Sequence, residues 1–402
     1  MSVLPALLIL ATAALPAAAR AQSGTATDAQ PVTWDAALRL RHEHVDDTAF
    51  RQPADATTLR LRLGLGARLA PGWEAYAQGE ATAALHDAYN NTANGKGTRP
   101  VVADPRSAEL NQAWLGWTGE RGHLRAGRQR MVLDNQRWVG PSAWRQNEQT
   151  FDSVAGRWQA TPAMSVSWAW LDRVHRVNTR QALDPLARER ALDSHVAEIE
   201  HKRGDRRAGA YLVLHQDLDQ PGASTRTYGA RWAVDRIREG HGWKLALDVA
   251  RQDDHGDNPG EFSHAYWRIE PAIARRGTTF GARWEHLGGD GRHALQAPLG
   301  TLHAFNGWAD MFLVTPAGGL DDRFASVGGR FLQHRGARAP TWVLAYHDYR
   351  ADTGGRYGHE IDASVSVPVS ASTSVLLKLA DYRSRGFRSD TRKLWLQLEW
   401  NR

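Results

Sequence analysis

The chain of 402 residues contains no cysteine. Disulfide bridges and thiolate metal sites are therefore excluded. Beyond the first twenty or so residues, the sequence has no apolar run long enough for a membrane-spanning helix, which needs ~20 residues. It also has no glycine-rich phosphate-binding loop after a strand-like segment. What the chain does must therefore be inferred from its repeating patterns and from its loops.

The N-terminus carries the signature of export. Val3 to Ala19 is an apolar run rich in Ala and Leu, and it ends in Ala19-Arg20-Ala21, a small-x-small cleavage pattern. We expect residues 1–21 to be a secretory signal peptide that is removed near Ala21. The run lacks the usual Lys or Arg before it, which departs from the common pattern. A membrane anchor, the alternative, would need a longer run without a processing site.

A long hairpin organises the rest of the chain. Leu occupies nearly every second position from Leu59 to Leu69, Pro71-Gly72 makes a turn, and alternation resumes from Trp73 to Leu85. Period-two alternation on both sides of a tight turn predicts a pair of antiparallel strands. Each arm has about a dozen residues, longer than the usual ~5–6 of a globular strand. Arms of this length can span a bilayer, where ~9–11 residues suffice.

Alternation continues to the C-terminus and predicts about eighteen strands, with sixteen as the alternative count. The predicted strands cover residues 34–41, 59–69, 73–85, 109–117, 123–129, 151–159, 164–170, 195–201, 208–215, 227–234, 243–252, 264–274, 278–286, 324–333, 341–349, 360–367, 374–382 and 394–400.

The lengths of the connections identify the architecture. Long connections such as Glu43–Thr57, Arg130–Thr150 and Leu287–Asp321 alternate with short turns along the whole chain. An up-and-down barrel has this parity because its periplasmic turns are short and its external loops are long. A sandwich with Greek-key links would not keep it. We therefore predict an all-β fold, a transmembrane up-and-down antiparallel β-barrel in the outer membrane, with residues 22–402 as one barrel domain.

Charged residues on the inner parity of the first strands are the candidates for lining the pore. In a membrane barrel the apolar face meets lipid and the polar face meets a water-filled lumen. Arginines there would attract anions, and nearby glutamates would keep the anions from being trapped. The alternative is that these charges pair with one another and only solvate the wall. The predicted pore-lining residues are Arg39, Arg41, Glu43, Arg60, Arg62, Arg68, Glu74 and Glu80.

Two long connections carry more specific residues than plain loops. One contains Gly127-Arg128-Gln129, Asp134-Asn135 and Arg137-Trp138-Val139-Gly140, and the other contains Thr301-Leu302-His303-Ala304-Phe305-Asn306-Gly307-Trp308-Ala309-Asp310. On these residues the chain resembles the alginate-export family of outer-membrane proteins. The resemblance implies a barrel whose lumen passes polysaccharide or smaller solutes. Arginine forks bind carboxylates bidentately. Because these long loops are rich in Arg, Asn and Trp, we expect part of them to fold into the lumen and narrow it.

The candidates for such a constriction include one residue of uncertain direction. Leu124 and Ala126 place Arg128 on the lipid parity, so Arg128 lies at the rim unless a bulge turns it inward. The candidates are Arg128, Arg130, Asp134, Asn135, Arg137, Arg145, Asp152, His303, Asn306, Trp308 and Asp310.

Other kinds of function have weaker support. His42 and His44 share one strand face, but two ligands do not make a zinc site, and we expect no metal or other cofactor. We identify no nucleophile and histidine on one face near the rim, so we expect a channel rather than a barrel-embedded enzyme. The formal charge of +6 could suggest nucleic acid, but the signal peptide argues against it.

The sequence therefore predicts a channel of the Gram-negative outer membrane. We expect it to pass an anionic, alginate-like saccharide by diffusion, with a general small-solute porin as the alternative. The expected partners are outer-membrane lipid, an anionic saccharide or other small anionic solute, and periplasmic export components.

Overall fold

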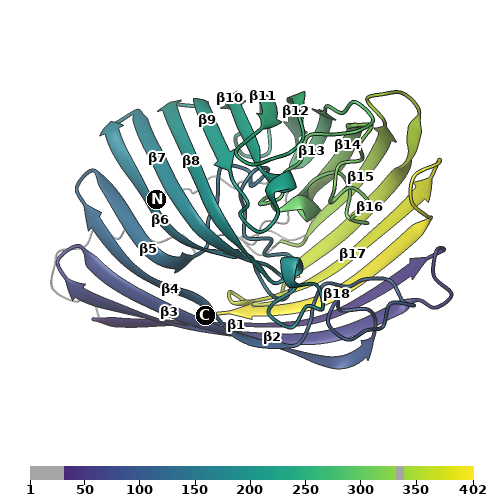
Figure 1. The fold of residues 1–402 in the computed structure, drawn as a ribbon, viewed down its shortest axis with the longest axis horizontal. Helices are drawn as coiled ribbons and strands as arrows, with labels where there is room; N and C mark the ends of the chain where they lie inside the picture. Colours follow the sequence, from purple (N-terminus) through teal and green to yellow (C-terminus); the bar gives the residue numbers. More distant parts are fainter. Residues whose placement is uncertain (1–30, 332–338) are drawn as a thin grey trace.

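A computed structural model describes residues 31–331 and 339–402. Its strands form one closed antiparallel sheet, in which every strand pairs with its neighbours in the sequence and β1 pairs with β18 (Figure 1). The predicted fold class and the count of eighteen strands are confirmed. The expected signal peptide at residues 1–21 and the predicted strand end at Gln333 lie outside the described residues.

All strands except β5, which has 8 residues, reach the ~9–11 residues that a membrane crossing needs. Three single-turn 3-10 helices lie in the loops between the strands. The strands are β1 (Val32–Asp47), β2 (Ala54–Ala70), β3 (Trp73–Ala88), β4 (Ser107–Gly119), β5 (Gly122–Gln129), β6 (Thr150–Thr161), β7 (Met164–His175), β8 (Glu189–Arg203), β9 (Arg206–His215), β10 (Thr225–Asp235), β11 (Gly242–Asp254), β12 (Ser263–Arg275), β13 (Thr278–Leu287), β14 (Leu320–Arg330), β15 (Thr341–Arg350), β16 (Arg356–Pro368), β17 (Thr373–Ser384) and β18 (Thr391–Asn401). The 3-10 helices are η1 (Pro185–Ala187), η2 (Pro221–Ala223) and η3 (Leu302–Ala304). In the part of the chain that the structure describes, no helix is long and apolar enough to cross a membrane.

One predicted boundary is wrong in an informative way. The stretch Glu43–Thr57 was expected to be a polar connection, but β1 continues to Asp47 and β2 begins at Ala54. Polar residues occupy both faces there, because His44 on the outer face contacts Asp55 of β2 at 2.7 Å while Glu43 is buried on the inner face. The outer ends of the strands have lost the apolar alternation that marks a strand in the sequence.

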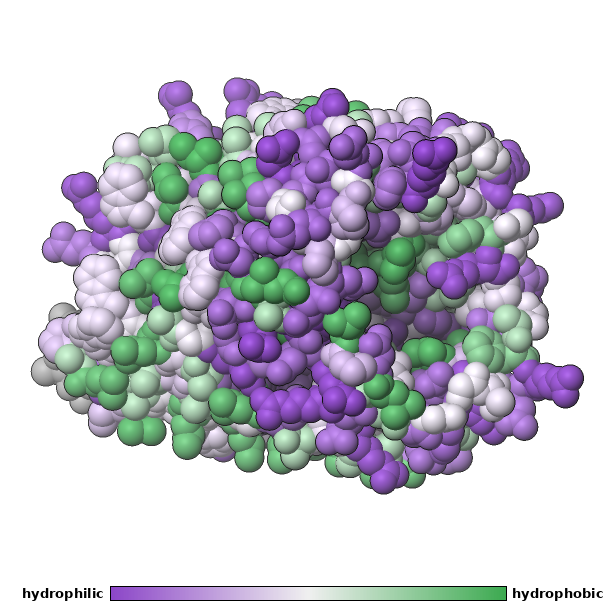
Figure 2. Space-filling view, viewed as in Figure 1, coloured by the Kyte–Doolittle hydropathy of each residue, from purple (hydrophilic) through white to green (hydrophobic). Residues whose placement is uncertain are grey.

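The outer face is apolar and bears a belt of exposed tryptophans near the short turns. Leu63 and Leu65 on β2 are 54% and 63% exposed, as expected for side chains that meet lipid. Figure 2 shows such hydrophobic side chains over parts of the outer wall and hydrophilic ones around the hollowed centre. Near the short-turn ends of their strands lie the tryptophans Trp34, Trp73, Trp117, Trp158 and Trp243, all exposed. A belt of tryptophans of this kind marks a membrane–water interface.

The lumen is partly filled by two connections. Residues 130–149, the first lumen loop, and residues 288–319, the second lumen loop, lie between the barrel walls (Figure 1). Trp138 of the first loop packs against Tyr211 of β9 and Tyr266 of β12, and Trp144 packs against Trp395 of β18. A single loop that reaches walls so far apart around the ring must cross the interior.

Candidate functional site

The two lumen loops are joined to each other. Val139 and Leu299 form a parallel β-bridge. The amide of Gly140 donates to the carbonyl of Leu299 at 2.9 Å, and the amide of Thr301 donates to the carbonyl of Gln136 at 2.9 Å. These bonds satisfy backbone groups that would otherwise be buried without partners. The loops therefore form one inserted unit.

Two of the predicted pore-lining arginines anchor the first lumen loop. Arg39 donates to the carbonyls of Ala143, Trp144 and Arg145 at 3.1–3.2 Å. Arg41 donates to the Trp144 carbonyl at 2.6 Å and to Gln397 of β18 at 2.7 Å. Backbone carbonyls without partners are strong acceptors, and a guanidinium has five donors in a fixed fork. These side chains therefore bind the protein itself.

The next pair of predicted arginines is also enclosed. Arg62 forms ion pairs with Glu80 on β3 and with Glu148 of the first lumen loop, the latter at 3.2 Å. Glu148 also accepts a bidentate contact from Arg130, at 2.6 and 3.0 Å. Arg60 pairs with Glu399 of β18 at 3.2 Å. Burial alone would raise the pKa of Glu148, but the two arginines lower it to about 2.

Asp310 is the centre of the anchorage of the second lumen loop. It contacts Arg145 at 2.8 Å, Lys393 at 3.0 Å and His303 at 2.6 Å. Burial opposes its ionisation, yet the cationic partners and the His303 hydrogen bond hold the pKa of Asp310 well below its usual range. Arg145 also reaches Glu43 on β1 at 3.4 Å, so this cluster connects both loops to the wall.

The protonation state of His303 follows from its two partners. Lys378 on β17 lies 2.7 Å from Nε2 of His303, and a lysine ammonium can only donate. Nε2 must therefore accept, and Nδ1–H donates to Asp310, so the imidazole is neutral. Burial, with opposition from the neighbouring carboxylate, lowers the pKa of His303 to about 3, in agreement with this assignment.

An aromatic cage surrounds the Lys378 ammonium group. Its Nζ lies 4.0 Å from the ring centres of both Trp144 and Trp308 and 5.3 Å from that of Trp395. Cations over tryptophan faces are attracted by the ring quadrupole, more strongly where water is excluded. Because Trp144 and Trp308 come from different lumen loops, Lys378 binds both loops to β17.

A second polar cluster holds the tip of the second lumen loop against β13 and β14. The side-chain Nδ2 of Asn306 donates to Glu285 at 2.8 Å and to Asp322 at 3.1 Å, and its Oδ1 accepts from Arg137 at 3.2 Å. Arg137 also pairs with Glu285 at 3.1 Å. The side-chain Oδ1 of Asn135 accepts from the backbone amide of Arg137 at 3.1 Å and shapes the turn before Arg137.

One part of the lumen stays open beside the loops. A cavity of about 450 Å³ lies between the first lumen loop and the strands β5–β9. Its wall includes Arg125, Arg157 and Arg207, whose side chains are 41%, 38% and 43% exposed. The acidic side chains of the cavity are more enclosed: Asp134 is 7% exposed, Glu198 10% and Glu200 17%. The surface that meets water in this cavity is therefore mainly cationic.

Paired carboxylates hold the cavity arginines in place without covering them. Asp134 contacts Arg207 at 2.8 Å and the buried Arg231 at 2.7 Å. Burial favours the neutral acid, but the two arginines prevail and lower the pKa of Asp134. Arg157 pairs with Glu200 at 3.0 Å. Each exposed guanidinium thus keeps donors free on its outer side.

The remaining predicted residues lie away from the loops. Arg128 contacts Asp152 at 2.8 and 3.1 Å, and no bulge interrupts the β5–β6 pairing. Both therefore stay on the outer parity near the external rim, and neither lies in a constriction. Arg68 is exposed and pairs in register with Glu74 near a short turn, where Glu74 also contacts Arg125 at 3.5 Å.

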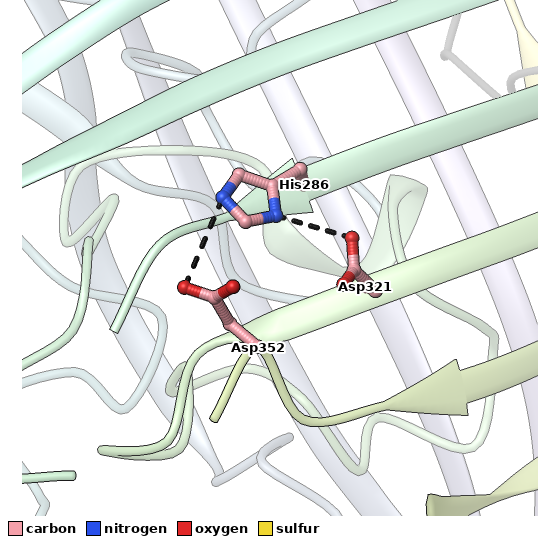
Figure 3. A group of neighbouring side chains, drawn as sticks. All are labelled: His286, Asp321 and Asp352. Atoms are coloured by element: carbon pink, nitrogen blue, oxygen red, sulfur yellow. Dashed lines mark hydrogen bonds and ion pairs between the residues drawn. The ribbon is translucent and has the colours of Figure 1, made fainter. Parts of the chain in front are cut away.

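One cluster outside the lumen has donor types that metals use. Donor atoms of His286, Asp321 and Asp352 lie within 4.8 Å of one another (Figure 3). Nδ1 of His286 faces Asp321 at 3.1 Å, while Nε2 faces Asp352 at 3.9 Å. The imidazole thus bridges two carboxylates, and they do not converge on one nitrogen. This geometry is a polar link between the β13–β14 rim and the loop after β15.

The closed barrel, its lipid-facing surface and its inserted loops define the class of this protein: an outer-membrane channel of the porin type. A model of the alginate export family matches residues 30–296. The chain therefore belongs to the alginate export family, as its sequence predicted, and the match includes the first of the two loops that suggested this family.

Solved structures with the same fold are more distant in sequence. They include OpdK from Pseudomonas aeruginosa with vanillate, at 15% identity over 92% of this chain and 98% of that chain, with a TM-score of 0.69. OpdO from Pseudomonas aeruginosa aligns at 14% identity over 92% and 97%, with a TM-score of 0.72. OccAB4 from Acinetobacter baumannii aligns at 11% identity over 93% and 98%, with a TM-score of 0.70. No curated protein matches the chain.

Sequence reasoning missed several residues of the site. Lys378 and Lys393 lie on the inner parity of β17 and β18, which the alternation of those strands could have indicated. Arg125, Arg157 and Arg207 also lie on inner parity, but nothing in the sequence says which arginines the loops leave uncovered.

Proposed function

We propose that this protein is a diffusion channel for small anionic solutes, with carboxylated saccharides as the substrate class. The observation that supports the proposal most is the open cavity beside the first lumen loop, where three arginines remain partly exposed while the acids stay enclosed. Arginine binds carboxylates through paired hydrogen bonds. A positive surface in a narrow channel raises the local concentration of anions.

The location of the cationic surface differs from the one expected from sequence. Arg39, Arg41, Arg60 and Arg62 are engaged by the lumen loops and by the neighbouring strands, so the anion path is assigned to Arg125, Arg157 and Arg207. OpdK, which shares the fold, has been solved with vanillate, an aromatic carboxylate. That ligand belongs to OpdK, but its carboxylate is the kind of group that the exposed arginines would bind here.

Export of a whole anionic polymer, with help from periplasmic export components, is the second candidate. Family membership favours it. The joined lumen loops oppose it, because the contacts of the first lumen loop with β9, β12 and β18 carry it across the lumen. Passage of a polymer would require the loops to leave the lumen.

Planar-bilayer recordings test the proposal. The mature chain should prefer anions over cations at low salt, and the preference should fall at high salt, since the Debye length is ~10 Å at 0.1 M and ~3 Å at 1 M. A short oligouronate should block the chloride current more than a neutral oligosaccharide of equal length. Changing Arg125, Arg157 and Arg207 together to Ser should weaken both effects.

The matched control removes the same charge from external loops outside the lumen, as Arg51→Ser, Arg180→Ser and Arg385→Ser, all exposed. Its selectivity should stay that of wild type. Cation preference in the wild-type channel, or equal loss of anion preference in both triple variants, would contradict an anion path along β5–β9.

A further inference from the structure

Three neighbouring hairpin turns carry a concentration of basic side chains. They join β8 to β9, β10 to β11 and β12 to β13, at the short-turn end of the barrel. Together they contain three acidic residues, Asp205, Asp235 and Glu239. Seven basic side chains on these turns are exposed or half-exposed, and we call them the basic rim: Lys202, Arg203, Arg206, Arg236, Arg238, Arg275 and Arg276.

Hydrogen bonds between the turns make the rim continuous. The Asp235 amide donates to the Asp205 carbonyl at 2.9 Å, and Nε of Arg236 contacts the Asp205 carboxylate at 2.6 Å. The Gly277 amide donates to the Gly240 carbonyl at 3.1 Å. The first turn is thus tied to the second and the second to the third, so the charges lie on one surface.

The fold itself does not account for this charge. Among the described residues, Lys202, Arg203, Arg275 and Arg276 form no ion pair. Arg276 has a φ of 51°, a left-handed conformation that Asn or Gly would adopt at lower cost. Among the other short turns that the structure describes, residues 71–72, 120–121, 162–163 and 369–372 carry only two charged side chains, Glu120 and Arg121.

The rim lies at the level of a membrane interface. The guanidinium carbon of Arg236 lies 5.3 Å from the centre of the outward-facing indole ring of Trp243. Trp243 belongs to the belt of exposed tryptophans around the barrel. Arg203, Arg206 and Arg275 follow the outer parity of their strands.

Directly next to the rim, the outer wall becomes apolar. Ile273 and Phe280 are 62% and 56% exposed on the lipid face. A row of guanidinium groups above an apolar wall matches a phosphate headgroup above its acyl chains. Because short turns face the periplasm, the lipid concerned would be in the inner leaflet.

We propose that the basic rim binds anionic phospholipids of the inner leaflet of the outer membrane. The arginines contact the phosphate and its additional negative headgroup charge, and Ile273 and Phe280 contact the acyl chains. Basic groups at a membrane surface favour anionic over zwitterionic lipid. This site is independent of the solute that the channel carries, since it lies on the outer wall.

Native mass spectrometry of the full mature chain in detergent provides the test. The protein is titrated with phosphatidylglycerol and, separately, with phosphatidylethanolamine of the same chains. Wild type should bind phosphatidylglycerol at least about fivefold more tightly, the size expected for one basic group at a membrane surface. The combined variant Arg203→Ser, Arg206→Ser, Arg236→Ser and Arg275→Ser should lose that preference.

A charge-matched control separates the rim from net charge. Arg51→Ser, Arg180→Ser, Arg385→Ser and Arg388→Ser remove four exposed charges from the external loops and should leave the preference intact. The heat-modifiable band shift of both variants should match wild type, which shows that each barrel has folded. Equal affinity for the two lipids in wild type, or equal loss in both variants, would overturn the proposal. So would tighter, rim-dependent binding of an oligouronate without any lipid preference, which would make the rim a surface for collecting polyanions.

Discussion

Arginines line both sides of the lumen, but their surroundings differ. Along β1 and β2, Arg41 is 0% exposed and Arg60 1%; Arg41 binds the first lumen loop and β18, and Arg60 pairs with Glu399 of β18. Along β6 and β9, Arg157 and Arg207 are 38% and 43% exposed, and each has one carboxylate within 3.0 Å. We call the first side, β14–β18 with β1–β4, the sealed sector, and the second, β5–β9, the open sector. The same residue type is structural in one sector and available to a solute in the other.

The largest expected effect is on stability, from the same substitution made in each sector. Arg62→Leu leaves the buried Glu80 and Glu148 short of a counter-charge, and breaking a buried pair in this way costs about 3–5 kcal/mol. Arg157→Leu removes a partly exposed pair and should cost about 0–1 kcal/mol. Urea unfolding in lipid vesicles measures both. Similar losses for the two variants would erase the distinction between the sectors.

The next effect is on conductance. Asp310→Ala removes the common partner of Arg145, Lys393 and His303, so it leaves Lys393 and His303 without this carboxylate and Arg145 with Glu43 alone. The second lumen loop should then detach from the barrel wall and no longer narrow the lumen, so the single-channel conductance should rise several-fold. Asp290→Ala, an exposed position in the same loop, is the control and should conduct like wild type. An unchanged conductance in a folded Asp310→Ala barrel would show that the loop does not limit flow.

Acid should loosen the sealed sector by a smaller amount. Burial lowers the pKa of His303 to about 3, whereas a released loop would titrate near ~6.5. Below pH ~6.5 the released loop binds more protons than the loop bound to the wall. The bound state therefore loses stability relative to the released state from that pH down to about 3. The pKa of Asp310 is also held low, which adds a further loss as the pH falls through ~3.9.

Conductance recorded at successively lower pH should therefore rise below ~6.5. His303→Gln keeps a polar side chain but cannot titrate, so its first rise should disappear while the Asp310 step remains. A wild-type conductance that stays flat down to ~4 would refute acid loosening.

The smallest expected effect concerns the aromatic cage. Lys378→Met keeps most of the volume between Trp144 and Trp308 but removes the charge and the hydrogen bond to His303. Replacing a buried charge by an apolar chain of similar size is often close to neutral, so conductance should change little. Lys378→Ala should instead leave a cavity and raise gating noise. If Lys378→Met changed the conductance as strongly as Lys378→Ala, the charge of Lys378, rather than its packing, would hold the loops in place.

The strand pattern could be predicted because, in a membrane barrel, the alternation of apolar and polar residues within each short segment specifies a strand. Leu63 and its alternating neighbours specify the outer face, and Pro71-Gly72 specifies a turn, each within a few residues. The strand end at Asp47 was missed because both faces are polar there, so the local signal disappears although the backbone pairing continues.

The candidate site depends on contacts that no local pattern records. Arg39 meets carbonyls 104 to 106 positions away in the sequence, and it meets Glu399 at 2.9 Å. The loops were expected to enter the lumen from their composition, but composition does not say which wall they cover. Arg128 could not be placed from the sequence, since that required knowing whether the β5–β6 pairing is regular.

The anchorage of the first lumen loop also bears on the order of assembly. Arg41 of β1 uses one guanidinium group to hold both the Trp144 carbonyl and Gln397 of β18. The surface that receives the last strand is therefore made of β1 together with a loop encoded a hundred residues later. We expect that β18 closes the ring only after this loop has settled against β1, so that a barrel closes with its loops already inside.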